Sequence, residues 1–228
     1  MKTFLTLIMM TLVTTPLLAE TPQLSVQGEA RLSVPADQMI MTIGVITENK
    51  MANVALSQNN ATIDKVLNAI KTLNLTDSKI ETATFRIDPV WQPTPMSPTP
   101  DWTPSIIAFR VTNTLTVQTN DLLMAGNLID ATIGAGANKI GSLVFGLKDP
   151  NAARSKAIAE ATAQAISHAK TVASASNVTL SQVMSISVDR AGIRPPIAFR
   201  AIQAETSVEA GDVDVTAAVT IDYAIESH

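Results

Sequence analysis

Hydrophobic residues along this chain of 228 residues follow two different periods. Apolar residues at every second position are typical of half-buried strands, whereas steps of three and four residues indicate a helix with one apolar face. Alternation predicts strands over residues 24–30, 39–47, 80–87, 106–117, 139–147, 183–189 and 213–223. Helical spacing predicts helices over residues 51–73, 122–129 and 151–176. We therefore expect an α+β fold with the order ββαββαβαββ, in which antiparallel curved sheets are covered by the two long helices.

The first two predicted strands are separated by Val34-Pro35-Ala36-Asp37, a segment with the composition of a turn. We expect these two strands to pair as a hairpin. Within the first strand, Gly28 indicates a bulge or a close approach of another backbone. Edge strands in such sheets must be covered or paired, and self-association is one way to meet that need.

The two long helices differ in their apolar faces. In the helix over 51–73, Asn59 falls on the same stripe as Ile63, Val66 and Ile70. We expect Asn59 to be a buried amide bonded to neighbouring backbone, with a ligand contact as the alternative. The helix over 151–176 has a thin stripe made largely of alanine, which permits close approach to a sheet or helix.

The ends of two further segments carry polar signals. Asp149 is a candidate N-cap for the helix over 151–176, with Pro150 tolerated in its first turn. Gly134, Gly136 and Gly141 lack the spacing of a phosphate-binding loop and indicate a turn before a strand. We expect Asn138 to stabilise this turn, with ligand binding as the alternative.

Residues 89–104 contain six of the twelve prolines and both tryptophans of the chain. Proline favours extended geometry and does not fit a central strand, so we expect a stiff tongue at the tip of a hairpin. Trp91 and Trp102 either fold back on their own sheet or pack against another molecule as interface anchors. Arg190, Arg194 and Arg200, in a later loop, are further candidates for contact with an acidic neighbour, although solvated loop charges are the simpler interpretation.

The first nineteen residues have the form of a secretory signal peptide. Lys2 precedes an apolar run from Phe4 to Val13, and small or tolerated residues lead to a cleavage position near Ala19. The run is shorter than the roughly 20 residues that a membrane-spanning helix needs, so we expect no transmembrane span in the mature chain of residues 20–228. The expected location is periplasmic or secreted.

Composition narrows the function classes. The chain has no cysteine, which excludes disulfides and thiol chemistry. The formal net charge is −4 and only 4% of residues are aromatic, so we expect no nucleic-acid partner. The two histidines, His168 and His228, provide too little material for a histidine triad or metal site, and we expect His168 on a helix surface.

Carboxylates supply the remaining route to catalysis. The candidates for an acid/base pair or a hard-cation site do not have the spacing of a calcium loop. They are Glu81, Asp88, Asp101, Asp149 and Asp212. A hydrolase would need two of them brought together by folding, with displaced pKa values. We therefore expect no enzyme, no catalytic residues, no cofactor and no metal, and retain the carboxylate hydrolase as a weak alternative.

Several segments together resemble the SIMPL-domain family over about residues 24–224. The segments are Val26-Gln27-Gly28-Glu29-Ala30, Val34-Pro35-Ala36-Asp37, Ile80-Glu81-Thr82, Ala135-Gly136-Ala137-Asn138, Phe145 before Lys148-Asp149, and Glu209-Ala210-Gly211-Asp212-Val213. Bacterial members of this family include exported oxidative stress defence proteins and periplasmic immunogenic proteins. The chain departs from the family at Ala108-Phe109, where members often have Gly-Tyr, and its tongue is an elaboration of its own.

The resemblance implies compartment and fold more strongly than chemistry. We expect a non-enzymatic exported protein that assembles into a homo-oligomer and contributes to envelope integrity or oxidative stress defence. The alternative is a binding module that recognises a partner protein or small envelope ligand through the tongue and the arginine-containing loop. In both cases the candidate interaction residues are Trp91, Trp102, Phe109, Arg190, Arg194 and Arg200.

Overall fold

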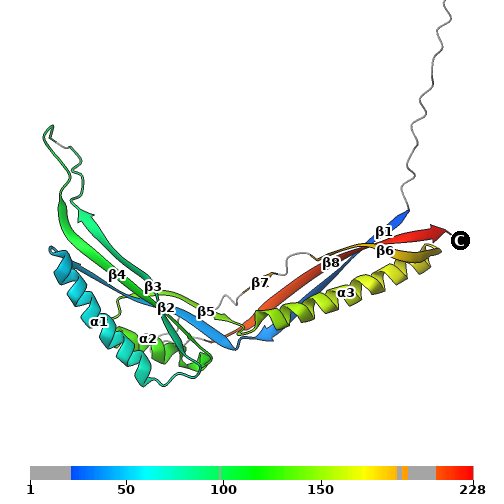
Figure 1. Cartoon of the computed structure of the whole chain (residues 1–228), viewed down its shortest axis with the longest axis horizontal. Coiled ribbons are helices and arrows are strands. Elements are labelled where there is room, and N and C mark those ends of the chain that lie inside the picture. Colours follow the sequence, from blue (N-terminus) through cyan, green and yellow to red (C-terminus); the bar gives the residue numbers. More distant parts are fainter. Residues whose placement is uncertain (1–21, 98, 189–191, 195–208, 228) are drawn as a thin grey trace, which may run out of the picture.

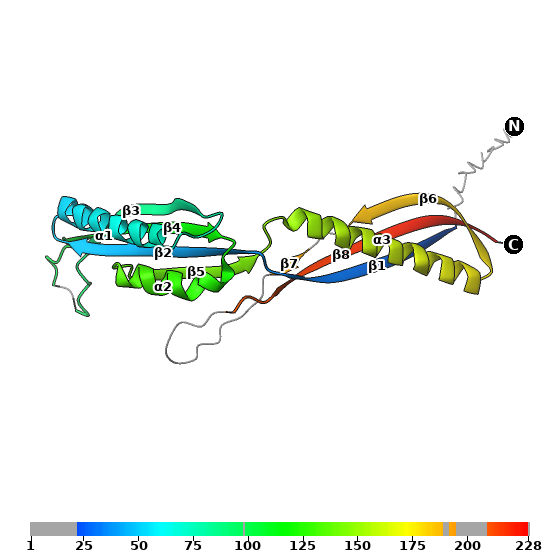
Figure 2. The ribbon, with the colours of Figure 1, turned by 90° about the horizontal axis from the view of Figure 1, so that it is seen from below.

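The computed structural model describes residues 22–97, 99–188, 192–194 and 209–227. Within these residues the chain forms an α+β fold with two antiparallel sheets and three α-helices, as expected for the class. The sheets lie end to end and the molecule bends where they meet, with the helices on one side of the bend (Figures 1 and 2). The predicted signal peptide lies outside the described residues.

One sheet, called sheet A, contains both ends of the described chain. Its strand order is β1-β8-β6, with β7 pairing to β8, and α3 covers one face. Its elements are β1 (Gln23–Pro35), α3 (Pro150–Ala175), β6 (Val178–Val188), β7 (Ile193–Arg194) and β8 (Asp212–Ser227). The two-residue strand β7 was not predicted, so the order of strands and α-helices is ββαββαβαβββ.

The other sheet, called sheet B, has the order β3-β4-β2-β5. Helix α1 packs on β2 and β4, and α2 lies beside α1. Its elements are β2 (Gln38–Asn49), α1 (Ala52–Thr72), β3 (Lys79–Trp91), β4 (Ile106–Thr119), the 3-10 turn η1 (Leu122–Met124), α2 (Ala125–Gly134) and β5 (Lys139–Gly146). Each long helix therefore covers its own sheet, and sheet B has a second, shorter helix.

The predicted hairpin of the first two strands is wrong. Strand β1 pairs along its whole length with β8, whereas β2 pairs with β4 and β5. The Asp37 backbone N–H donates to the Gly146 carbonyl at 3.0 Å, and the Asp37 carboxylate accepts from the Lys148 N–H at 2.6 Å. Asp37 thus ties the chain to the end of β5, and the segment that resembled a turn passes it from one sheet to the next.

Close contact between β1 and α3 organises sheet A. The buried face of α3 consists of alanines four residues apart, namely Ala157, Ala161, Ala165, Ala169 and Ala173. A Cβ atom at Gly28 would lie 2.1 Å from the Ala161 carbonyl oxygen, so the glycine allows the helix backbone to rest on the strand. The predicted close approach at Gly28 is confirmed. Beside it, the Gln164 side chain accepts from the Glu29 N–H at 2.5 Å.

The core of sheet B is built from larger side chains. Met39, Met41, Ile43 and Val45 alternate along β2, lie beside the buried apolar residues of the neighbouring strand β4, and face the helices. Asn59, fully buried on α1, donates from Nδ2 to the carbonyl oxygens of two strands, Val45 at 3.0 Å on β2 and Val111 at 3.3 Å on β4. The predicted role of Asn59 as a backbone-bonded buried amide is confirmed.

We predict that Gly28→Ala will destabilise the protein, because the added methyl overlaps backbone atoms of α3 that cannot move independently of the helix. We expect a loss of about 3 kcal/mol in the free energy of unfolding, measured by urea denaturation. Gly134→Ala is the control, because a Cβ there meets no atom within 4 Å. Equal stability of the two variants would show that α3 does not rest on β1 as described.

Candidate interaction site

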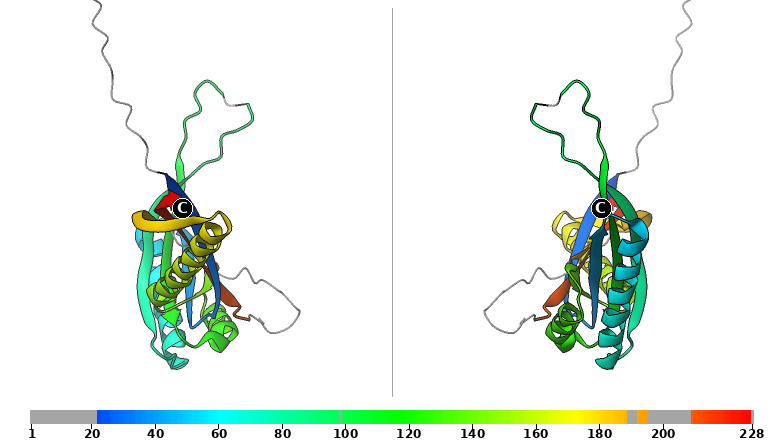
Figure 3. Two further views of the ribbon diagram at one scale, coloured as in Figure 1. Left: turned by 90° about the vertical axis from the view of Figure 1, so that its right-hand side faces the viewer. Right: turned by 90° about the vertical axis from the view of Figure 1, so that its left-hand side faces the viewer.

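Strands β3 and β4 form the predicted hairpin, and the tongue continues from its tip beyond the end of sheet B (Figures 1 and 3). The base of the tongue is closed by the Gln92 N–H, which donates to the Ser105 carbonyl at 2.8 Å. The Ser105 hydroxyl donates in return to the Gln92 side chain at 3.0 Å. Strand β3 runs through Pro89 to Trp91, further than predicted, which an edge strand permits.

The three aromatic candidates lie at this end of the molecule. Trp91 is the last residue of β3 and is 52% exposed. Phe109 is partly buried on β4, opposite Pro89 of β3 and Asn49 of β2. Trp102 is partly buried in the tongue, where its backbone N–H donates to the Thr99 carbonyl at 2.9 Å. Its buried indole nitrogen has no acceptor among the described residues.

Further exposed apolar residues on the hairpin were missed by sequence reasoning. Phe85 and Ile87 on β3 are 50% and 41% exposed, and Ile106 and Ile107 on β4 are exposed as well. Strict alternation placed Ile80, Thr82, Thr84 and Arg86 on one face, but the register shifts between Thr82 and Thr84. Beyond this bulge, Phe85 and Ile87 share the α1 side of the sheet with Ile80, and α1 does not reach far enough to cover them.

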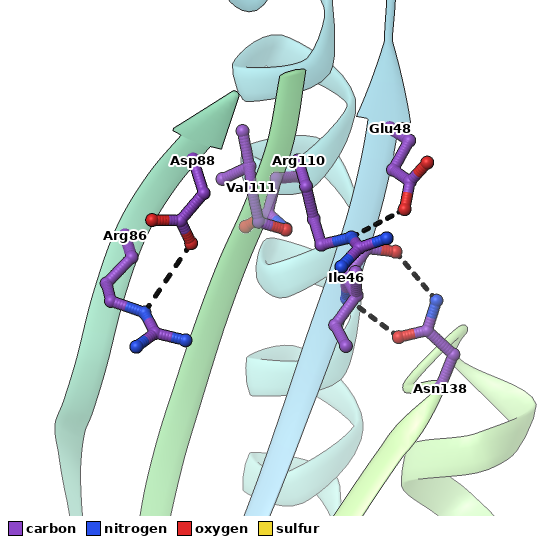
Figure 4. Close-up of polar contacts among 8 residues, drawn as sticks. Ile46, Glu48, Arg86, Asp88, Arg110, Val111 and Asn138 are labelled. Carbon is purple, nitrogen blue, oxygen red and sulfur yellow. Dashed lines mark hydrogen bonds and ion pairs between the residues drawn. The ribbon is translucent and has the colours of Figure 1, made fainter. Parts of the chain in front are cut away.

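The opposite face of sheet B carries ion pairs, two of which are drawn in Figure 4. Arg110 Nε lies 2.5 Å from Glu48 Oε1, across β4 and β2. Arg86 Nε lies 3.7 Å from Asp88 Oδ2 along β3, where Lys79 and Glu81 form a similar pair at 2.9 Å. All of these side chains are about half exposed or more, so each pair contributes little to stability.

Asn138 has a structural role in this region (Figure 4). Its side chain donates to the Ile46 carbonyl and accepts from the Ile46 N–H, both at 2.7 Å. Gly136, at a φ of +106°, makes the turn that brings Asn138 to β2. Asn138 therefore stabilises the turn, as expected, by imitating the hydrogen bonding of a neighbouring strand.

The arginine-containing loop is only partly described. Arg194 lies on β7, whose backbone pairs with Asp214 of β8 in sheet A. Arg190 and Arg200 lie outside the described residues. Because β7 belongs to sheet A and the tongue extends from the far end of sheet B, the structure does not bring Arg194 together with the tryptophans (Figure 1).

The carboxylates singled out from the sequence are distributed over several elements. Glu81 and Asp88 are paired with basic residues on β3, and Asp149 caps α3 by accepting the Asn151 and Ala152 N–H groups. No group of three or more potential metal ligands occurs in the described part of the chain. The predicted N-cap is confirmed.

A groove of about 840 Å³ lies where the two sheets meet. It is lined by Asp121, Glu209 and Asp212 together with the apolar residues of η1. Asp212 accepts from the Ser33 hydroxyl at 2.8 Å, and Asp121 accepts from the Thr76 N–H. These two carboxylates therefore hold neighbouring segments of the fold in place.

Sheet A also has a polar face, on the side away from α3. The Asp222 carboxylate on β8 lies between hydroxyls of the two neighbouring strands, Ser185 of β6 and Ser25 of β1. The hydrogen bond from Ser185, and then that from Ser25, lowers the pKa of Asp222 below its ordinary value. His168 on α3 lies with Nδ1 3.0 Å from the Gln27 carbonyl, so it contacts the backbone of β1 from the helix surface.

These observations define a two-sheet α+β protein whose exposed features are an aromatic tongue and an open, charged edge strand. The chain belongs to the SIMPL family, because the family model, described as a protein of unknown function (DUF541), matches residues 24–223. This match begins in β1 and ends in β8, so it spans both sheets.

Relatives resemble the chain over most of their length. The 26 kDa periplasmic immunogenic protein of Brucella melitensis is 29% identical over 90% of this chain and 85% of its own. The protein of the same name from Brucella abortus has the same identity and coverage. The uncharacterized protein YggE of Edwardsiella ictaluri is 26% identical over 77% of this chain and 72% of its own. In the described residues, no helix has the length and apolar character needed to cross a membrane.

We predict that Ser185→Ala will lower stability in a pH-dependent way. A carboxyl with a lowered folded pKa contributes stability above its unfolded pKa of about 4, and this contribution is lost as pH falls through the folded pKa. The stability difference between wild type and Ser185→Ala should therefore be larger at pH 7 than at pH 3, measured by urea unfolding. Ser187→Ala, opposite Thr220 on the same face, is the control. A difference independent of pH would contradict the role of Asp222.

Proposed function

We propose that this SIMPL protein is exported to the periplasm, has no enzymatic activity, and works there as a homo-oligomer that supports envelope integrity or oxidative stress defence. The observation that carries the assembly is the set of apolar residues left exposed on the β3–β4 hairpin, with Phe85 and Ile87 on the α1 side of the sheet and Trp91 at the end of β3. Such residues favour an interface, because covering them removes apolar surface from water.

The location and the cellular role have separate support. The first nineteen residues have the pattern of a signal peptide, and two relatives carry the word periplasmic in their names. The contribution to oxidative stress defence rests on the family resemblance alone. Export without cysteine also means that packing or assembly, and not disulfides, must stabilise the chain.

A second candidate function is a binding module for a partner protein or small envelope ligand. The observation that favours it is the tongue itself, where Met96 is fully exposed and the buried Trp102 indole nitrogen has no acceptor among the described residues. A polar ligand group could accept from this nitrogen once the tongue has adjusted to it. The arginine-containing loop would then form a separate contact, because Arg194 lies in sheet A.

We predict that the protein purified from the periplasm will be an oligomer whose mass falls when residues 92–101 are deleted. The physical reason is that the deletion removes most of the tongue, and with it the contacts that the tongue makes between copies of the chain. Light scattering of both proteins checks this prediction, with circular dichroism to establish that the shortened protein is folded. A monomer in both cases would refute the assembly and favour the binding module, for which Trp91→Ala and Trp102→Ala are the first variants to test.

We also predict that a strain lacking this protein will survive hydrogen peroxide less well than its parent. Survival should return when the wild-type gene is restored. If assembly is needed for this role, the variant lacking residues 92–101 should not restore survival at equal protein level. Identical survival of the deletion strain and its parent would refute the proposed role in oxidative stress defence. The proposed role in envelope integrity would then be tested by exposing both strains to detergents.

A further inference from the structure

Strand β3 is one of the two outer strands of sheet B, whose order is β3-β4-β2-β5. It pairs with β4 on one side, and no described strand pairs with its other side. Helix α1 packs on β2 and β4, which leaves the outer half of the sheet uncovered. An open strand of this length presents unpaired backbone groups that can bind another strand, unless its side chains prevent it.

The charged side chains of β3 all lie on one face. Lys79, Glu81, Arg86 and Asp88 stand opposite Gln118, Thr116, Thr112 and Arg110, which are alternate residues of β4. Directly opposed residues share a face, so the four charges lie together on the face away from α1 (Figure 4 shows Arg86 and Asp88). The bulge between Thr82 and Thr84 produces this arrangement, because without it the second pair would point to the other side.

The order of these charges is positive, negative, positive, negative. Read from the opposite end, as a second antiparallel copy would present it, the order is negative, positive, negative, positive. With Lys79 opposite Asp88 of the second copy, Glu81 lies opposite Arg86, and the same two pairs recur by symmetry. Every charge on the strand therefore meets its opposite.

The apolar side chains of β3 also fit this register. Ile80 and Ile87 stand opposite Val117 and Val111 of β4, on the α1 side of the sheet. In the antiparallel arrangement Ile80 meets Ile87 of the second copy, and Thr82 meets Phe85. Ile87 and Phe85, which are exposed in the single chain, would each gain a neighbour. Pro89 lies just beyond the paired segment, so its missing N–H does not interrupt the new ladder.

We propose that the β3 edge binds the β3 edge of a second copy of this chain, antiparallel and around a two-fold axis, over residues 79–88. This proposal rests on the proposed self-assembly and names the surface and register of one contact within it. The charges favour this register, because it gives all four charged residues a partner of opposite sign, whereas a two-fold pairing centred on Arg86 or on Asp88 would set two like charges against each other. Apolar contact and backbone hydrogen bonds supply the attraction.

Two double variants test the register, each made by exchanging the charges of one pair. One carries Lys79→Glu with Glu81→Lys, and the other carries Arg86→Asp with Asp88→Arg. Each double variant keeps the net charge of the chain, and its two exchanged residues still carry opposite charges. In either variant alone, every charge across the proposed contact meets a like charge, and we expect this association to weaken on the order of a hundredfold. A mixture of the two variants restores four opposite pairs and should recover it.

A cysteine pair gives an independent readout in a chain that has no cysteine of its own. Thr82→Cys in one copy and Phe85→Cys in another should form a disulfide-linked dimer when the two proteins are produced together. Each variant alone should give little, because its two cysteines would stand two ladder positions apart, with the bulge residue 83 not counted. Efficient cross-linking of either variant alone would overturn the register.

The outcomes separate this proposal from the proposed function. If the wild-type protein is an oligomer and both charge variants keep its mass in light scattering, self-assembly stands and the β3 contact is wrong. If both variants weaken but their mixture does not recover, this register is wrong. If the wild-type protein is a monomer at the highest concentration reached, the proposed self-assembly fails and the β3 contact fails with it. Circular dichroism establishes that the variants are folded.

Discussion

The contact between Gly28 and α3 determines how the two halves of the protein are divided. Because the helix backbone rests directly on β1, the first strand is held under α3 and pairs with β8. Strand β2 then begins a different sheet, where it becomes a central strand with α1 above it. A side chain at Gly28 or a larger residue on the alanine stripe would separate α3 from sheet A, since densely packed layers transmit such strain.

The junction between the sheets depends on a few polar residues. Asp37 accepts the Lys148 N–H, and Lys148 Nζ lies 2.9 Å from Asp77, which also accepts from Asn120. These bonds connect the start of β2, the turn before β3, the end of β4 and the segment leading to α3. The hydrogen bond and charge of Asp77 raise the pKa of Lys148. The exposed ion pair adds little energy by itself, but the backbone bonds around it set where the chain changes sheets.

The division into two sheets leaves the aromatic tongue at one end of the molecule, beyond sheet B. Sheet A has β1 and β6 as the ends of its strand order, whereas β3 is an outer strand of sheet B and leads into the tongue. The tongue projects from the end of the hairpin (Figure 3), and both the apolar Phe85 and Ile87 and the charged side chains of β3 are exposed. A surface placed at the end of an elongated molecule can meet another molecule without interference from the rest of the chain, which suits assembly better than catalysis in a cleft.

The local elements of this protein can be predicted from its sequence alone. Apolar spacing located the long helices within a residue or two, Asp149 indicated the start of α3, and the prolines indicated the tongue between two paired strands. These features depend on neighbours in the chain, so they can be predicted from short segments. The partners of β1 and β2 could not be predicted, because the alternation in these two strands is satisfied equally by a hairpin or by two separate sheets. The bulge at Thr82 and Thr84 also left no signal, although it turns Phe85 and Ile87 onto the α1 side and gathers four charges on the other. These points follow from the fold of the whole chain, because strand register is set by contacts between segments distant in the sequence.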